Sequence, residues 1–199
     1  MDKLDPAFEF NLKNATVLLI DASTNQLDLL EQILRGFGAR SMRRCADLDE
    51  ATEMVRATPF HLVLVDSFPP DGAGLKFIRW LREEGGEANA FCPVLMLSGQ
   101  ATLDAVSKAR DAGANMVLAK PVAPTAMLQR IIKVAEDTRP FIECATYRGP
   151  DRRVRRQGPP PGMRGRRSDD VNTRLTNSDG PNMSQNEIDS LLIPQRAVG

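Results

Sequence analysis

The chain lacks the features that would place it in a membrane or outside the cell. Long hydrophobic runs are missing, and no segment approaches the roughly 20 apolar residues that span a bilayer. The start, Met1 to Lys3, lacks the basic-then-apolar order of a secretory signal. The three cysteines are isolated, with no Cys-x-x-Cys pair and no metal-ligand spacing. We therefore expect a reducing, cytoplasmic setting. The single histidine, His61, opens an apolar run, where we expect it to be packed.

The chain also has no net charge, but this zero is the sum of two parts of the chain with different charge. Residues 1–147 carry 16 Lys and Arg against 20 Asp and Glu, whereas residues 148–199 carry 10 arginines, no lysine and 6 acids. The second part also has no Phe, Trp or Tyr. Because so little apolar surface cannot offset the entropy of the chain, we expect this C-terminal tail to be mostly disordered.

The first part alternates between short apolar runs and helical patterns. The runs at 17–20, 62–65, 94–97 and 116–119 are apolar on both faces, which is typical of strands covered by helices on both sides. A more polar strand is expected at an edge, around 40–45. Between the strands, apolar residues recur every three or four positions, and Asp47 with Glu50 forms a capping box. The alternation predicts an α/β fold with a five-stranded, doubly wound parallel sheet.

One polar residue directly follows each of the four apolar runs: Asp21, Asp66, Ser98 and Lys120. Ligands of open parallel sheets collect at the carboxyl edge of the strands, so these side chains should meet in one pocket. Asp21 and Asp66 suit a hard divalent cation such as Mg²⁺. A carboxylate such as Asp66 can also accept a phosphoryl group, whose oxygens the hydroxyl and ammonium groups could bind.

These residues resemble the receiver domains of bacterial response regulators of the CheY type. The stretch from Asp66 to Gly74 matches the family's acceptor aspartate and its Pro-x-x-x-Gly turn, and Ser98-Gly99 matches the switch Ser/Thr with its small neighbour. The pair Lys120-Pro121 matches a Lys-Pro pair whose peptide bond is usually cis in the family. The resemblance covers residues 14–138 or so and implies a flavodoxin-like fold, Asp66 as phosphoacceptor, and Ser98 and Lys120 as switch residues.

Two positions depart from the family pattern. The family places paired acids after the first strand, but this chain has Asp21 followed by Ala22. Fewer charged ligands mean weaker Mg²⁺ binding, so phosphorylation is expected to be weakened or absent. The family's aromatic switch position on the last strand is Val117. The sequence leaves open whether Asp66 is phosphorylated or forms a structural hydrogen-bonded cluster with the switch residues.

The tail between Arg148 and Arg167 holds eight arginines, one acid and no lysine. A tether to nucleic acid or to a membrane needs only charge, which lysine supplies equally well. Arginine also grips phosphates, reads the O6/N7 edge of guanine and stacks on flat rings. Cyclic di-GMP offers two phosphates and two guanines. The segment resembles that of the Cle class of CheY-like proteins, which implies cyclic di-GMP binding and action on the flagellar motor.

The candidate cyclic di-GMP ligands gather in and next to this segment. They are Tyr147, Arg148, Asp151, Arg152, Arg153, Arg155, Arg156, Arg164, Arg166 and Arg167. Arg152 and Arg156 have an Arg-x-x-x-Arg spacing, and Asp151 is placed to accept hydrogen bonds from guanine. Nucleic acid, an anionic membrane and a plain linker remain alternatives, and the lack of interleaved aromatic residues argues against nucleic acid.

A second signal lies near the C-terminus, at residues 182–192. Ser184 and Glu187 form a capping box, and Ile188, Leu191 and Leu192 form one apolar face. The segment resembles the N-terminal peptide of the flagellar switch protein FliM. We expect a short amphipathic helix at 184–193 that folds against another surface, because two turns are unstable alone. That surface is either this chain's own receiver face or another protein.

Four parts follow: an N-terminal extension at 1–13, a receiver domain at 14–140, an arginine-rich ligand-binding segment at 141–175, and a tail with the short helix at 176–199. The favoured function is a non-catalytic, cyclic di-GMP-responsive adaptor that acts on a FliM-like motor switch protein, which would recruit it to the flagellated pole. The alternative is a phosphorelay receiver that a histidine kinase phosphorylates at Asp66, with the tail only a tether.

Overall fold

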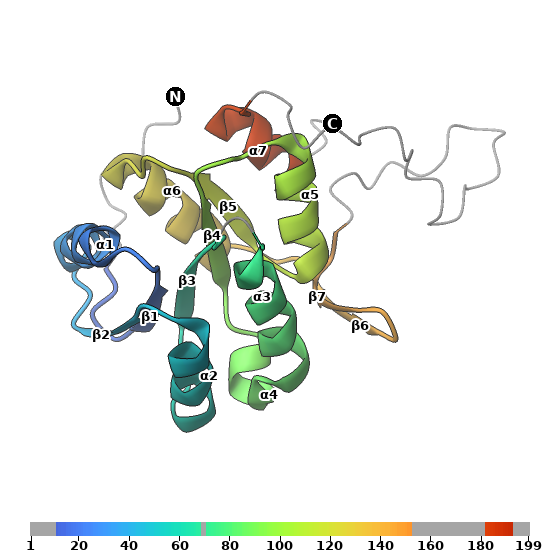
Figure 1. Cartoon of the computed structure of the whole chain (residues 1–199), viewed down its shortest axis with the longest axis horizontal. Helices are drawn as coiled ribbons and strands as arrows, with labels where there is room; N and C mark the ends of the chain where they lie inside the picture. Colours follow the sequence, from blue (N-terminus) through green and yellow to red (C-terminus); the bar gives the residue numbers. More distant parts are fainter. Residues whose placement is uncertain (1–10, 69–70, 153–181, 193–199) are drawn as a thin grey trace, which may run out of the picture.

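The computed structural model describes residues 11–68, 71–152 and 182–192. Its centre is a five-stranded parallel sheet in the order β2-β1-β3-β4-β5 (Figure 1). The strands are β1 (Thr16–Ile20), β2 (Ser41–Cys45), β3 (Leu62–Asp66), β4 (Val94–Ser98) and β5 (Met116–Ala119). The predicted fold class is confirmed, including the edge position of the polar strand β2.

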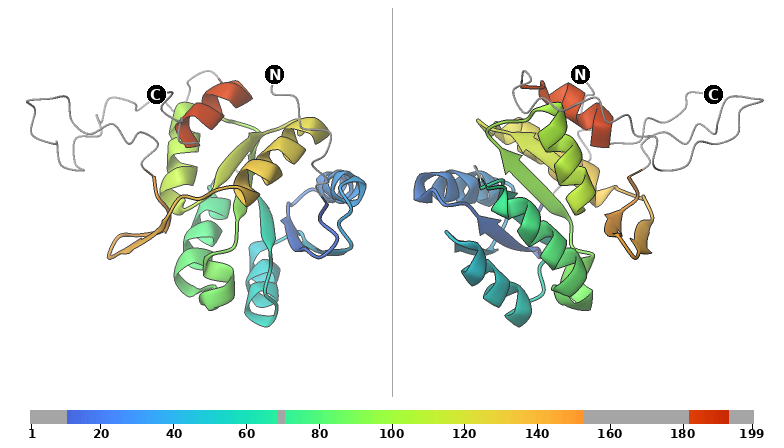
Figure 2. Two further views of the ribbon diagram at one scale, coloured as in Figure 1. Left: turned by 180° about the vertical axis from the view of Figure 1, so that it is seen from behind. Right: turned by 45° about the vertical axis from the view of Figure 1, so that its right-hand side comes forward.

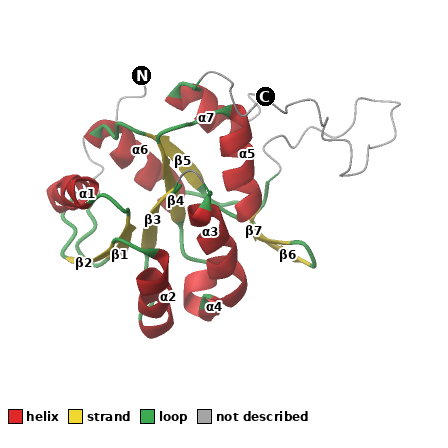
Figure 3. Cartoon of the chain, viewed as in Figure 1, coloured by secondary structure: helices red, strands yellow, loops and turns green. Residues whose placement is uncertain are grey.

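Six helices connect and follow these strands and cover both faces of the sheet (Figure 3). They are α1 (Thr24–Gly36), α2 (Leu48–Ala57), α3 (Ala73–Glu84), α4 (Gly86–Ala90), α5 (Leu103–Ala112) and α6 (Pro124–Ala135). Local signals set their starts. Asp47 accepts a hydrogen bond from the Glu50 amide at 2.8 Å, as the capping box predicts, and Pro124 opens α6.

Each face of the sheet packs into its own apolar cluster. Side chains alternate along a strand, so Leu18 and Ile20 join residues of α2, α3 and α5, whereas Val17 and Leu19 join residues of α1 and α6. All four side chains are fully buried. Continuous apolar strands therefore reflect a sheet that is covered on both sides, as the sequence indicates.

One packing prediction is wrong. His61 is exposed rather than buried in the apolar run that it opens. Its Nδ1 accepts a hydrogen bond from the amide of Thr16 at 3.1 Å, and its own amide donates to the Thr16 carbonyl at 2.8 Å. The imidazole thus closes the start of β1 at the surface instead of entering the core.

A short antiparallel hairpin follows the last receiver helix. Its strands are β6 (Phe141–Cys144) and β7 (Tyr147–Pro150), and β7 lies against α3 and α5 (Figure 2). This hairpin was not predicted; the arginine-rich segment was expected to begin at residue 141. Close backbone contact holds the hairpin in place, because a Cβ atom at Gly149 would lie 3.0 Å from the Cα of Gly113.

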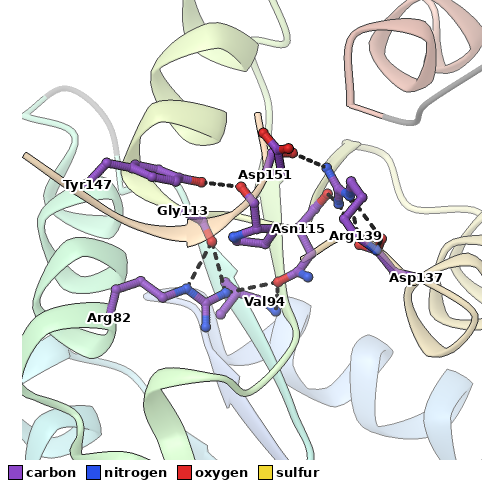
Figure 4. Close-up of polar contacts among 9 residues, drawn as sticks. Arg82, Val94, Gly113, Asn115, Asp137, Arg139, Tyr147 and Asp151 are labelled. Carbon is purple, nitrogen blue, oxygen red and sulfur yellow. Dashed lines mark hydrogen bonds and ion pairs between the residues drawn. The ribbon is translucent and has the colours of Figure 1, made fainter. Parts of the chain in front are cut away.

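The buried side chain of Arg82 ties together the part of the domain where the hairpin docks. Its guanidinium group donates to the carbonyl of Gly113 at 2.8 and 3.0 Å, to the carbonyls of Ala90 and Cys92 at 2.7 Å, and to Oδ1 of Asn115 at 2.9 Å. Figure 4 shows the contacts to Gly113 and Asn115. Burial lowers the pKa of Arg82 to about 10, so the group stays charged near neutral pH.

A last helix, α7 (Gln185–Leu192), lies against β5 and α5 at the end of α5 away from the hairpin (Figure 1). Its capping box forms as predicted, with the Ser184 amide and hydroxyl both 2.7 Å from the Glu187 carboxylate. Within the described ranges, no helix has the length and apolarity that crossing a membrane requires. The expected disorder of the rest of the tail concerns residues outside these ranges.

Gly113 should tolerate a side chain poorly. Its φ is +98°, and an added Cβ would lie 2.9 Å from Cγ of Arg82 and 3.0 Å from the carbonyl oxygen of Arg148. We expect Gly113→Ala to lower the free energy of unfolding by about 2 kcal/mol in urea titrations followed by circular dichroism. Gly36→Ala is the control, because nothing lies within 4 Å and alanine should stabilise this helix end by about 0.5 kcal/mol. Equal effects of the two variants would contradict the packing described here.

Candidate functional site

Three of the four predicted strand-end residues meet at the carboxyl edge of the sheet. Asp21 follows β1, Asp66 ends β3 and Lys120 follows β5. The Lys120 ammonium lies 2.6 Å from Oδ2 of Asp21 and 2.5 Å from Oδ1 of Asp66. The side chains of Asp21, Asp66 and Lys120 are only 4%, 10% and 20% exposed, so these ion pairs form largely away from water.

The remaining carboxylate oxygens are also held. Oδ1 of Asp21 accepts a hydrogen bond from the Ser23 amide at 2.9 Å, and Oδ2 of Asp66 accepts one from the Phe68 amide at 2.6 Å. Both carboxylates therefore have fixed orientations. Burial works against the charge of Lys120, but the hydrogen bonds and charges of the two aspartates outweigh it and raise the pKa of Lys120.

Ser98 does not join this cluster. Its hydroxyl donates to the Gln100 carbonyl at 3.0 Å and accepts from the Gln100 amide at 3.2 Å, which closes the turn after β4. A structural cluster that includes Ser98, as the sequence allowed, is therefore not formed; the cluster consists of Lys120 and the two aspartates. The Lys120–Pro121 peptide bond is cis, as the family resemblance implies.

The residues around the two aspartates fit a divalent cation only in part. Asp21 and Asp66 reach a common point, because both contact the same lysine nitrogen. The neighbouring position that would supply a further carboxylate is Ala22, which is exposed. Across the residues that the structure describes, no three side chains of His, Cys, Asp or Glu come together as a metal site. A weak Mg²⁺ site therefore stays a prediction.

The first predicted cyclic di-GMP ligands lie on the hairpin and just after it. Tyr147 is buried, and its hydroxyl donates to the Pro150 carbonyl at 2.6 Å. Arg152 packs on the Tyr147 ring, with its Cζ 4.1 Å from the ring centre, and lies 3.2 Å from the Asp111 carboxylate. Tyr147 is thus a packing residue of the hairpin, and its ring is covered by Arg152.

Arg148 and Asp151 are also engaged with the receiver surface. Arg148 lies over the ring of Phe91 and 3.6 Å from Glu143. The Asp151 amide donates to the Pro140 carbonyl at 2.9 Å, and Arg139 approaches the Asp151 carbonyl (Figure 4). The other predicted ligands, Arg153, Arg155, Arg156, Arg164, Arg166 and Arg167, lie outside the described residues. The ligand assignment therefore stays a prediction.

The helix α7 occupies part of the last helix–strand–helix face, at β5 and the start of α5. The Gln185 side chain contacts the backbone of β5, where the Ala119 amide donates to Oε1 at 3.0 Å and Nε2 donates to the Val117 carbonyl at 2.8 Å. Ile188 is fully buried in the apolar cluster of that face. The sequence indicated an apolar face for this helix, but it gave no sign of the role of Gln185.

Comparison with known proteins agrees with this geometry. Residues 17–132 match the family model of the response regulator receiver domain. The chain belongs to this family. As a receiver, it is a component of two-component signalling. The role of Asp66 as phosphoacceptor stays a prediction.

Individual relatives resemble the receiver along most of its length. The Vibrio cholerae chemotaxis protein CheY-3 is 24% identical over 62% of this chain and 94% of its own. The Pseudomonas aeruginosa response regulator PilR is 32% identical over 53% of this chain, which spans only 22% of PilR. The solved structure of CheY4 from Vibrio cholerae has a TM-score of 0.55 and 25% identity, and the match covers 60% of this chain and 98% of that one.

Removing the lysine of the receiver cluster should leave two carboxylates facing each other. We expect Lys120→Met to cost about 2 kcal/mol of unfolding free energy near neutral pH without divalent cations. The raised pKa of Lys120 means that the wild-type lysine stabilises the fold at every pH below its ordinary value of 10.5 and loses this effect only as pH rises through the raised value.

The loss should shrink only as the pH rises above 10.5 and through the raised pKa of Lys120, because the wild-type lysine then no longer offsets the repulsion between the aspartates. Urea titrations near neutral pH and at about pH 11 measure both effects. Lys76→Met, on the exposed side of α3, is the matched control and should change stability little at either pH. A pH-independent cost of Lys120→Met would argue against repulsion between the aspartates.

Proposed function

We propose that this receiver is a cyclic di-GMP-responsive, CheY-like adaptor without catalytic activity that acts on a FliM-like protein of the flagellar motor switch. The observation that carries the proposal is that the arginine-rich segment has an anchor on the receiver at each end. On one side of the segment Arg152 contacts Asp111, and on the other side the Met183 amide donates to the Ala101 carbonyl. A ligand that organises the intervening arginines therefore acts between two fixed points.

The two anchors lie at opposite ends of α5 (Figure 1). At the C-terminal end of the helix, Arg152 contacts Asp111, and Gly149 packs on Gly113. At the N-terminal end, the Met183 amide donates to the Ala101 carbonyl at 2.9 Å. A helix of 10 residues separates the anchors by about 15 Å. Because the rigid helix α5 keeps the two anchors at a fixed distance, a ligand that binds the segment between them can change the tension on α7.

The chemistry of the segment supports cyclic di-GMP over a general polyanion. Arginine forks pair with phosphates and with the O6/N7 edge of guanine, whereas a purely electrostatic tether works equally well with lysine. Arg152 already uses the flat face of its guanidinium on the Tyr147 ring, with 4.1 Å between Cζ and the ring centre. Guanine bases offer the same kind of surface to the arginines that follow.

The motor assignment is supported by α7 and by the relatives. The sequence of α7 resembles the FliM N-terminal peptide, and the helix lies on the receiver's last helix–strand–helix face. Two relatives that this chain covers almost completely are named chemotaxis proteins, from Vibrio cholerae and Pseudomonas aeruginosa. A surface that accommodates α7 suits the corresponding helix of a motor protein, and binding there would bring the adaptor to the flagellated pole.

Titration calorimetry with cyclic di-GMP tests the ligand. We expect wild-type protein to bind with measurable heat and the combined Arg153→Ala, Arg155→Ala and Arg156→Ala variant to lose at least tenfold in affinity, or about 1.4 kcal/mol. These three positions avoid Arg152, whose contact with Asp111 is structural. The same three arginines replaced by lysine keep the charge but lose the planar fork.

The lysine variant distinguishes recognition of the nucleotide by the segment from a general electrostatic tether. If it loses affinity like the alanine variant, the fork recognises the nucleotide. If lysine fully restores binding, or if the affinity for cyclic di-GMP equals that for a diguanylate of linear form, the segment is a general electrostatic tether. No heat with the wild-type protein would reject the ligand.

A second candidate is a phosphorelay receiver, with the tail as a tether. The contact of Lys120 with both aspartates favours it, because an ammonium group beside Asp66 is placed to bind the oxygens of an acyl phosphate. A histidine kinase would then supply the phosphoryl group, and Mg²⁺ at Asp21 and Asp66 would neutralise charge during transfer.

Restoring the missing acid tests this candidate. We expect Ala22→Asp to tighten Mg²⁺ binding by about tenfold, because another carboxylate joins Asp21 and Asp66. Labelling by acetyl phosphate should then become faster in Ala22→Asp than in wild type and should vanish in both backgrounds after Asp66→Asn. Label that persists after Asp66→Asn would place the phosphoryl group elsewhere and contradict the assignment.

A further inference from the structure

Among the residues that the structure describes, β5 is the last strand of the sheet, so one of its two sides has no neighbouring strand there. Its inward groups pair with β4, and the amide of Lys120 continues this pattern by donating to the Ser98 carbonyl at 2.8 Å. The amide of Ala119 and the carbonyl of Val117 lie on the opposite side. Such unpaired edge groups favour binding of another hydrogen-bonding partner.

The side chain of Gln185 supplies that partner. The Ala119 amide donates to its Oε1 at 3.0 Å, and its Nε2 donates to the Val117 carbonyl at 2.8 Å. One carboxamide thus gives the strand edge the acceptor and the donor that a residue of an added strand would give. The side chain of Gln185 thus takes the place of a peptide group at the edge of the sheet.

Two further contacts fix the position of α7 on this surface. Just before the helix, the Met183 amide donates to the Ala101 carbonyl at 2.9 Å, and the Met183 side chain packs against the apolar cluster beneath. One turn later, Ile188 is fully buried in the same cluster. The surface therefore recognises three side chains, those of Met183, Gln185 and Ile188. They define the pattern Met-x-Gln-x-x-Ile.

We propose that the surface formed by β5 and the start of α5, here the α5–β5 surface, recognises helices of the pattern Met-x-Gln-x-x-Ile, and that α7 is its resident ligand within the same chain. The resident helix competes with any external helix of this pattern. That the external competitor belongs to the motor switch rests on the proposed function; the recognition pattern and the intramolecular occupation do not.

The contacts explain why other side chains fail at position 185. Glutamate keeps the acceptor for Ala119 but places a carboxylate oxygen against the Val117 carbonyl, so one hydrogen bond becomes a repulsion. Asparagine is one methylene shorter and does not reach both groups of the strand. The neighbouring Asn186 is exposed, and the same amide-to-acid change there alters charge without touching β5. Asn186→Asp is therefore a matched control.

Fluorescence anisotropy with a labelled peptide of the sequence 182–193 measures access to the surface of the full-length chain. A tethered ligand has an effective concentration of about 1 mM, so a resident helix with a Kd of about 0.1 mM should weaken binding of the free peptide by about tenfold. We expect Gln185→Glu or Ile188→Asp in the chain to release α7 and to tighten peptide binding by this factor. Wild type and Asn186→Asp should bind the peptide equally weakly.

The same peptide carrying Gln185→Glu is the specificity probe and should bind none of the chains. Hydrogen exchange of the Ala119 amide provides a second readout, because this amide should be protected in wild type and in Asn186→Asp and exchange faster in Gln185→Glu and Ile188→Asp. Circular dichroism should show that all variants stay folded, since α7 packs on a domain that is complete without it.

Several results would overturn the proposal. Equal peptide affinity for wild type and the released variants would show that α7 does not occupy the surface. Equal affinity of the 182–193 peptide and its Gln185→Glu form would show that the surface does not recognise Gln185. Protection of Ala119 that rises with protein concentration would place the helix on a second copy instead. The measurements contain no nucleotide and no motor protein, so they can fail while cyclic di-GMP still binds, and the calorimetry can fail while α7 still occupies the surface.

Discussion

The parallel direction of the five strands is the constraint on which the rest of this structure depends. Because every strand ends at the same edge, single residues that are far apart in the sequence meet there, and Lys120 comes to lie between Asp21 and Asp66. In the described part of the chain the sheet is also open, so β5 at its end has one side without a neighbouring strand, where α7 binds. At the opposite edge, Arg82 joins the segments before β4 and β5 through the carbonyls of Cys92 and Gly113, and its guanidinium lies over the ring of Phe141 in the hairpin.

The cluster at the carboxyl edge has its own electrostatic balance. Two carboxylates and one ammonium leave a single negative charge, and alanine at position 22 removes the charge that would make the site strongly attractive to a divalent cation. Lysine already neutralises much of the repulsion between the aspartates. Lys120 therefore stabilises the two facing aspartates, and Mg²⁺ binding stays a prediction.

Much of the fold could be predicted from the sequence, because its signals are local. Apolar runs of four residues and the Asp47 capping box predict the parallel sheet and the start of a helix. The polar residues that follow the strands predict where Asp21, Asp66 and Lys120 meet. What the sequence did not reveal depends on contacts between distant residues. The two-residue turn of the hairpin, Ala145-Thr146, lacks the Gly or Asn that usually marks such a turn in a sequence, and the hairpin forms because Gly149 meets Gly113 and Tyr147 is buried.

The same reason explains the errors. His61 looked like part of a buried run, but the run begins one residue later, and the imidazole serves the start of β1. Ser98 follows its strand as the others do, yet its hydroxyl bonds its own turn. Gln185 carried no signal, because a neutral amide in a short helix is ordinary until the open edge of β5 is known.

The neutrality of Gln185 has a consequence for how such a switch can be operated. A contact made of one carboxamide and buried aliphatic side chains carries no net charge, so ionic strength and moderate acidity leave it nearly unchanged. Occupancy is then governed by geometry: how often the connecting chain returns the helix to its place. The occupancy of the surface by α7 can then be controlled by shortening the connecting chain, by stiffening it or by binding a ligand to it. The salt concentration of the cell has little influence on it.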